Sequence, residues 1–289
     1  YAADWRCFSS WCEDAGLDPL PASPGTLTAY VVALAKARAV STISRRISAI
    51  ASAHHLAGHA SPAAHPQFVQ VWKGIRRKHG TAAEGARPIT GPELRALVAV
   101  NDGDSPKAIR DRALILLGFH LAARRSELAA MQVEDLEDAA EGIRVTVQRS
   151  KTDQEGEGFA KGVMYQADPK VCPIRALDAW LEVSRITEGP IFRSISKGGT
   201  VKETPLDGRT VARVVQAAAK KAAAAGLLKS AEGYSGHSLR AGLATTAAAS
   251  GAPERAIAAQ GGWKSTATLR RYIRPATVFA ENVGASLKI

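Results

Sequence analysis

Apolar side chains recur every three or four residues along most of the 289-residue chain, and this spacing restricts the fold to one built mainly from helices. In residues 1–16 it places Trp5, Phe8 and Trp11 or Cys12 on one stripe. Because this first helix begins without a capping residue, we expect it to extend before Tyr1. Further helices, each bounded by Pro, Gly or Ser, are predicted over 23–37, 41–58 and 65–80. Residues 1–79 are therefore expected to form a helical domain.

A second domain is expected over residues 89–289. Residues 80–88, with the sequence GTAAEGARP, lack large apolar side chains and carry Gly and Pro, so we interpret them as a linker. Residues 142–150 and 160–167 have the pattern of strands, joined by a loop rich in Gly and charge. Helical spacing predicts helices over 90–100, 105–131, 172–185, 206–226, 237–250 and 253–262, and continues to the end. The expected fold class is mostly α, with a helical N-terminal domain and a mixed α+β domain that holds a small antiparallel sheet.

The charge of the chain points to a polyanionic partner. The net charge is +11, and residues 1–87 alone hold 10 basic and 5 acidic side chains, so both domains carry the excess. Nucleic acid and an anionic membrane surface both fit, and so does a merely basic surface. The longest apolar stretch, residues 113–123, is too short to cross a bilayer, so we expect no membrane partner.

The three cysteines, Cys7, Cys12 and Cys172, form no CxxC pair. An odd number without such a pair argues against a disulfide framework and against a zinc site. We therefore expect a cytoplasmic protein without a metal site.

His237 and Arg240 lie three positions apart in GHSLRAG, at the start of a predicted helix. This spacing puts both side chains on one face, where an imidazole and a guanidinium can converge on an anion. The same pattern occurs often in helices without any site. Five further candidates occur along the chain, namely Arg124, Glu127, Lys151, Trp263 and Tyr272.

Each of these five residues also has an ordinary explanation. Arg124 and Glu127 suit a surface ion pair of a helix, and Lys151 suits a hairpin charge that keeps a sheet edge soluble. Trp263 suits a core position, and Tyr272 suits a half-buried position on a helix. Taken singly, none of them establishes a site.

Together the seven residues suit a phosphodiester site without metal. Two guanidiniums can neutralise the charge that builds on a pentavalent phosphorus, and His237 and the Trp263 indole can donate further hydrogen bonds. Tyr272 is the candidate nucleophile, because the surrounding positive charge favours its phenolate. Lys151 is placed to protonate the departing 5′ oxygen. Glu127 can only accept hydrogen bonds, so we assign it a supporting role, orienting Arg124 or His237.

The order of these motifs resembles the tyrosine recombinase, or phage integrase, family. That family carries RxxE, a β-hairpin Lys, HxxR, then His or Trp, then Tyr, and here SGHSLRAG, GGW and RRYIR follow in that order. The segments DWRCFSSWC, AYVVALAKARAVSTISRRISAI and IRRKHG resemble the family's core-binding domain, so the likeness covers nearly the whole chain. The Trp at position 263 groups the chain with members that have Trp rather than His there.

The resemblance implies a C-shaped clamp around duplex DNA and a homotetramer on two DNA sites, with a monomer or dimer in the absence of DNA. It implies catalytic roles for Arg124, Glu127, Lys151, His237, Arg240, Trp263 and Tyr272. The first helix and residues 41–50 match the helices that enter the major groove. Candidate DNA contacts are Arg6, Thr42, Ser44, Arg45, Arg46, Ser48 and, matching a guanine-reading position, Arg209. A solvated face is an equal explanation for Arg45 and Arg46.

The implied activity is site-specific breakage and rejoining of DNA through a 3′-phosphotyrosine. The resemblance also implies a bacterial, phage-encoded or plasmid-encoded protein that associates with the nucleoid. One ester is exchanged for another, so no cofactor, neither ATP nor a metal ion, is expected. A type IB topoisomerase or a telomere resolvase would use the same chemistry, and a DNA-binding regulator with residues 41–55 as its recognition helix is the alternative from another class. The tail at 279–289 either docks on a neighbouring subunit in a head-to-tail ring or packs on its own domain.

Overall fold

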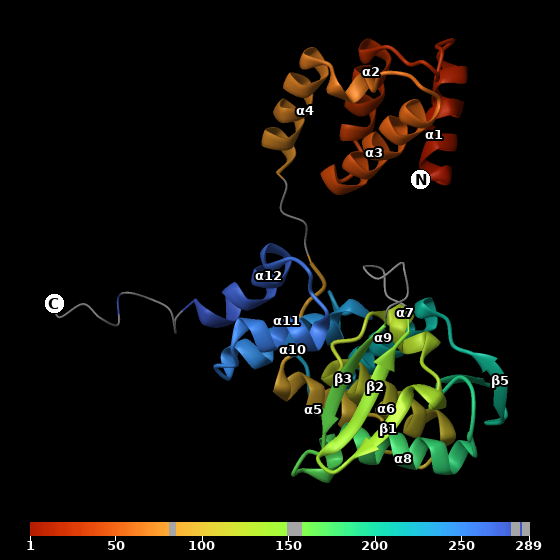
Figure 1. Cartoon of the computed structure of the whole chain (residues 1–289), viewed down its shortest axis with the longest axis vertical. Helices are drawn as coiled ribbons and strands as arrows, with labels where there is room; N and C mark the ends of the chain where they lie inside the picture. Colours follow the sequence, from red (N-terminus) through yellow and green to blue (C-terminus); the bar gives the residue numbers. More distant parts are fainter. Residues whose placement is uncertain (81–84, 149–157, 279–283, 285–289) are drawn as a thin grey trace. The chain divides into compact units, whose positions relative to one another are not determined.

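A computed structural model describes residues 1–80, 85–148, 158–278 and 284 of the chain. It divides into two compact units, residues 1–85 and 86–289 (Figure 1). Lys151 and almost all of the tail lie outside the described residues.

The first unit is the predicted helical domain. Its elements are α1 (Ala2–Asp14), α2 (Pro24–Ala35), α3 (Val40–Leu56), a short 3-10 helix (Pro62–Ala64) and α4 (Pro66–His79). The Ser23 hydroxyl caps α2 by accepting the backbone N–H of Thr26 at 3.0 Å. Phe8, Tyr30 and Phe68 pack in a core that is separate from that of the second unit. The four helices predicted from spacing are confirmed.

The second unit is mixed, as predicted. Its helices are α5 (Gly91–Ala99), α6 (Pro106–His120), α7 (Arg125–Ala130), α8 (Pro173–Ser184), α9 (Gly208–Ala224), α10 (His237–Ala249), α11 (Glu254–Gly261) and α12 (Thr266–Thr277), with 3-10 turns at Val133–Asp135 and Pro169–Val171. A three-stranded antiparallel sheet has the order β1 (Leu136–Ala139), β2 (Gly142–Val147), β3 (Phe159–Met164). A second sheet pairs β4 (Arg193–Ile195) with β5 (Val201–Pro205). The sequence pattern predicted β2 and β3 but neither β1 nor the second sheet.

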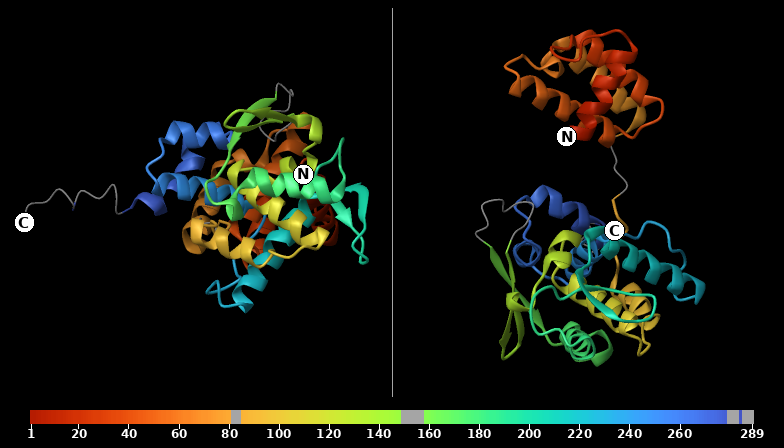
Figure 2. Two further views of the ribbon diagram at one scale, coloured as in Figure 1. Left: turned by 90° about the horizontal axis from the view of Figure 1, so that it is seen from below. Right: turned by 90° about the vertical axis from the view of Figure 1, so that its right-hand side faces the viewer.

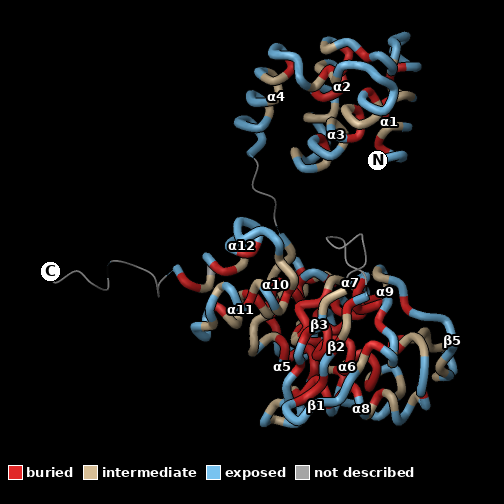
Figure 3. The backbone as a smooth tube through the Cα atoms, in the orientation of Figure 1, coloured by how far each residue is buried: buried red, intermediate tan, exposed pale blue. Residues whose placement is uncertain are grey.

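Helix α6 is the centre of the second unit. Residues 113–117 have no exposed surface, and α6 packs against α5, α7, α8, α9 and α10. Figure 3 shows the buried residues concentrated in α6 and the strands next to it. The right-hand view of Figure 2 shows the three-stranded sheet along one side of this helical layer. Val145 pairs with Lys161 and Val147 with Phe159 across β2 and β3.

The helix predicted over 105–131 is two helices, because the chain reverses after His120. The N–H of Ala123 donates to the Gly118 carbonyl at 3.0 Å, and that of Ala122 donates to the Phe119 carbonyl at 2.9 Å. These two bonds close a left-handed helix cap at Ala122, whose φ is 46°. A left-handed Ala costs about 1–2 kcal/mol, so surrounding contacts must hold it. The turn places Arg124 at the N-cap of α7.

Helix α10 packs directly on the backbone of Ile89. The Ile89 N–H donates to the Ser238 carbonyl at 3.1 Å. One turn further along α10, a Cβ added to Gly242 would lie 2.2 Å from the Ile89 carbonyl oxygen. Only a residue without a side chain permits this approach.

Gly242→Ala should therefore lower the free energy of unfolding by about 1–3 kcal/mol, the usual cost of overpacking a close contact. Differential scanning calorimetry of the second unit's transition measures the loss. Gly91→Ala is the matched control, because Gly91 opens α5 and nothing lies within 4 Å of an added Cβ. Equal midpoints for the two variants would contradict the packing argument.

Candidate active site

The first turn of α10 carries His237 and Arg240 on one face. The helix begins at His237, directly after Gly236, where an added Cβ would lie 3.3 Å from the Arg125 Cβ. This close approach brings the start of α10 against the start of α7. The predicted spacing of the two side chains is thus realised on a helix that borders Arg124.

Arg240 is almost completely buried, at 2% exposure. Its Nη1 donates to the Ala122 carbonyl at 2.7 Å and to the Gly261 carbonyl at 2.5 Å, and its guanidinium carbon lies 3.8 Å from the centre of the Trp263 ring. Burial, with the nearby charge of Arg124, lowers the pKa of Arg240 to about 10 against an opposing effect of Glu127. The group remains cationic at neutral pH, and its orientation is fixed from both sides.

Arg124 and Glu127 form a capping box at the start of α7. The Glu127 carboxylate accepts the Arg124 backbone N–H at 2.9 Å and its guanidinium Nη1 at 2.5 Å. The Glu127 side chain is 2% exposed and the Arg124 side chain 18% exposed. The pair is therefore not the surface ion pair that its spacing alone also allowed.

Tyr272 lies next to His237. Its hydroxyl, on α12, is 2.7 Å from His237 Nε2, and the centres of the Tyr272 and Trp263 rings are 6.1 Å apart. The partial withdrawal of the His237 ring from water, and then the charges of Arg240, Arg124 and Arg125, lower the pKa of His237. At neutral pH the imidazole is neutral and can accept the phenol proton.

The structure brings six of the seven predicted residues together. Arg124, Glu127 and Tyr272 all lie close enough to Arg240 to shift the pKa of its guanidinium electrostatically. The seventh, Lys151, lies outside the described residues. The arrangement is a cationic cradle with a hydroxyl beside it, which suits attack on a bound phosphate.

Lys161, a buried lysine of β3 that borders this cluster, was not among the site residues expected from the sequence. Its Nζ donates to the Leu121 carbonyl at 2.7 Å. Burial, with the charges of Arg240 and Arg124, lowers its pKa to about 8, although Glu127 opposes the shift. The strand alternation could have placed Lys161 on the inward face of β3, since Phe159 and Val163 lie two residues away on either side.

The predicted DNA contacts of the first unit divide into two groups. Arg6, Ser44 and Ser48 are exposed, and Thr42 is partly so. Arg45 reaches Asp4 with two hydrogen bonds of 2.9 Å, while 60% of its side chain stays exposed. Arg46 donates to the Tyr30 hydroxyl at 2.7 Å with only 15% exposure of its side chain. Arg46 therefore stabilises the core of the unit. In the second unit, Arg209 is exposed in the first turn of α9.

The last two turns of α4 form a basic surface whose residues were not among the DNA contacts expected from the sequence. A hollow of about 700 Å³ is lined by Gln70, Lys73, Arg76, Arg77 and Gly80. The run IRRKH in the sequence was the available signal. Such a surface suits phosphate oxygens.

No metal or membrane feature occurs in the part of the chain that the structure describes. No three side chains of His, Cys, Asp or Glu gather there as ligands for an ion. Among the same residues, no helix combines the length and the apolar character needed to span a membrane.

Comparisons with known proteins identify the family of the chain. Residues 87–277 match the phage integrase family. The integrase/recombinase xerD homolog of Selenomonas ruminantium is 38% identical over 98% of this chain and 82% of its own length. The structure of a lambda integrase dimer bound to a COC' core site superimposes with a TM-score of 0.61, at 17% identity, over 87% of this chain and 79% of that one.

The fold and site together define a tyrosine-type site-specific recombinase. The chain belongs to the phage integrase family.

Trp263 led us to expect Cre as the nearest relative. The recombinase Cre of Escherichia phage P1 is 24% identical over 93% of this chain and 81% of its own length. This identity is well below the 38% of the Selenomonas protein. The expectation rested on Trp263 and on the likeness of short N-terminal segments, and identity over the whole chain outweighs both.

Glu127→Gln should lower the free energy of unfolding by about 1–3 kcal/mol, because the buried carboxylate that accepts the Arg124 guanidinium is replaced by a neutral amide. Urea unfolding of the purified protein measures the change. Glu137→Gln is the matched control: Glu137 pairs with Arg144 at 2.8 Å, but more than half of each side chain is exposed. That variant should lie within about 0.5 kcal/mol of the parent. Equal losses would show that burial does not strengthen the Arg124–Glu127 pair.

Proposed function

We propose that the protein exchanges DNA strands at specific sites through a 3′-phosphotyrosine on Tyr272. The observation that carries this proposal is the 2.7 Å contact between the Tyr272 hydroxyl and His237 Nε2, beside a buried, oriented Arg240. A half-buried tyrosine needs no such partner to pack. A nucleophile needs a proton acceptor and a nearby cationic site for the phosphate.

The cleavage step assigns one task to each group. His237 accepts the Tyr272 proton as the phenol oxygen bonds to phosphorus, and the bond from phosphorus to the 5′ oxygen breaks. Arg124 and Arg240 hold the non-bridging oxygens, and the Trp263 indole N–H donates to the same group. Lys151 gives the 5′ oxygen its proton.

The rejoining step reverses the first on a partner strand. A 5′ hydroxyl attacks the phosphotyrosine, releases the phenol and takes over the phosphoryl group. The ester bond is conserved, so ATP is not needed. Glu127 takes no part in bond changes; it orients Arg124 through its two hydrogen bonds.

DNA would be bound by both units. The exposed side chains Arg6, Thr42, Ser44, Arg45 and Ser48 are the proposed groove and phosphate contacts of the first unit, together with the basic surface of α4. Arg209 is the proposed guanine contact of the second. The fold resembles that of the Tn1549 transposon integrase, solved in complex with transposon right end DNA. The two structures match with a TM-score of 0.62, at 13% identity, over 86% of this chain and 80% of that one. This similarity of fold supports the proposal that the chain binds DNA. We propose assembly as a homotetramer on two sites.

Tyr272→Phe should abolish covalent attachment to a nicked suicide duplex, because the nucleophilic oxygen is gone while the ring is kept. The adduct is measured by denaturing gel electrophoresis. Tyr165→Phe is the control, since Tyr165 is exposed after β3 and has no proposed task. A DNA-binding regulator would give salt-sensitive binding with no adduct for any form. An adduct that persists in Tyr272→Phe would remove the proposed nucleophile.

Lys151→Ala should cleave slowly, by about 10²–10⁴-fold, because the leaving oxygen loses its proton donor. A duplex whose 5′ bridging oxygen is replaced by sulfur needs no donor and should restore the rate. Single-turnover cleavage on both duplexes checks this. A variant that stays slow on the sulfur duplex would contradict the assignment of Lys151 as general acid.

A further inference from the structure

Three side chains from three elements bind the turn that follows α6. The last carbonyls of a helix have no partner within it, and they carry the negative end of the helix dipole. Here the three consecutive carbonyls of residues 120–122 are each satisfied by a side chain from elsewhere. The bonds are Gln260 Nε2 to His120 at 2.8 Å, Lys161 Nζ to Leu121 at 2.7 Å and Arg240 Nη1 to Ala122 at 2.7 Å.

This turn sets the position of both arginines of the site. Arg240 binds its last carbonyl, and Arg124 follows two residues after Ala122, at the start of α7. The left-handed Ala122, with φ at 46°, is unfavourable by itself. Side chains that clamp the neighbouring carbonyls therefore fix a backbone that would otherwise relax.

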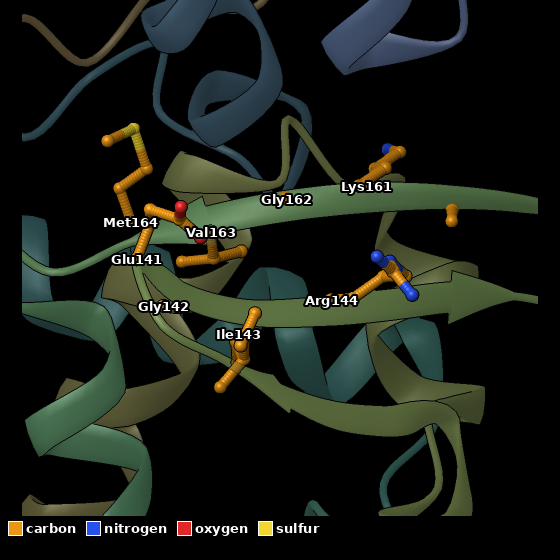
Figure 4. A pocket seen from close by; sticks show the side chains of 10 residues that line it. Glu141, Gly142, Ile143, Arg144, Lys161, Gly162, Val163 and Met164 are labelled. Carbon is orange, nitrogen blue, oxygen red and sulfur yellow. The ribbon is translucent and has the colours of Figure 1, made fainter.

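Lys161 is the charged clamp that comes from the sheet. It is 3% exposed, and its Nζ lies 5.2 Å from the centre of the Phe159 ring, which in turn abuts Gly262. Figure 4 shows Lys161 beside Gly162 on β3, at a hollow of about 270 Å³ along the β2–β3 ladder. A lysine that merely kept a strand soluble would reach water.

The charges around Lys161 make its burial costly. Arg240 and Arg124 repel its ammonium, and Glu127 attracts it. Burying a cation beside two others is unfavourable unless a hydrogen-bond acceptor compensates for the lost water. Here the Leu121 carbonyl, at the C-terminal end of α6, is that acceptor. Gln260 reinforces the same junction, because its Nε2 also donates to the Gly162 carbonyl of β3 at 3.0 Å.

We propose that Lys161 is a positioning residue for strand cleavage, which fixes the Leu121 carbonyl and thereby the turn that sets Arg124 and Arg240 around the scissile phosphate. The proposal rests on the proposed function, since it concerns the geometry of that same site. It separates Lys161 from Lys151: the first holds the cradle, and the second moves a proton.

The test compares Lys161→Met with Lys202→Met, an exposed lysine of β5, as the matched control. Cleavage of the suicide duplex is followed in single turnover, and DNA affinity is followed by fluorescence anisotropy. Lys161→Met should cleave about 10- to 100-fold more slowly, the scale of a misplaced catalytic group, while its Kd stays within about 2-fold of the parent. Lys202→Met should match the parent in both.

Two further arms keep the outcome decisive. Lys161→Met should stay slow on the duplex with a 5′ bridging sulfur, because its defect is geometric; rescue there would make Lys161 a proton donor and overturn the proposal. Gln260→Leu removes a neutral clamp of the same turn and should also slow cleavage at unchanged Kd. If Lys161→Met cleaves at the parental rate, the inference is refuted. If Lys161→Met fails to fold, a parental cleavage rate in Gln260→Leu refutes it instead. Absence of any adduct from the parent would refute the proposed function instead.

Discussion

The burial of the Arg240 guanidinium is the interaction on which the site depends. A buried cation is tolerated only where hydrogen-bond acceptors surround it, and here the Ala122 and Gly261 carbonyls and the Trp263 ring fill that need. Ala122 follows the end of α6, whereas Gly261 and Trp263 both lie at the end of α11, so the position of Arg240 requires that α6, α10 and α11 all be in place. The catalytic geometry is therefore a product of the whole second unit.

The cradle is charged in excess of its own compensation. Glu127 balances Arg124, but Arg240 and Lys161 add positive charge that no second buried carboxylate offsets among the described residues of the cluster. Burial, and then this repulsion between cations, lowers the pKa of Arg240 and of Lys161, and a bound anion would stabilise both charges. A phosphate diester brings one negative charge in the ground state and more in the transition state, so under the proposed function we expect the site to stabilise the transition state more than the substrate.

The sequence predicted which residues share a helix face better than it predicted the turns between the helices. Helical spacing located His237 and Arg240 correctly, because three positions on a helix fix a shared face whatever the tertiary structure. The turn at Ala122 could not be predicted: LAAR contains no Gly or Pro, and the left-handed backbone exists only because distant side chains bind its carbonyls. For the same reason the hydrogen bond of Arg46 could not be predicted, because its partner Tyr30 comes from another helix. Long-range contacts of this kind leave no local signal in one sequence.

We infer that the Tyr272 oxygen becomes esterified to DNA. The most direct measurement is mass spectrometry of the peptides recovered after nuclease and protease digestion of the protein incubated with its target duplex. We expect a nucleotide attached through a 3′-phosphate to Tyr272. Attachment at any other side chain would contradict it.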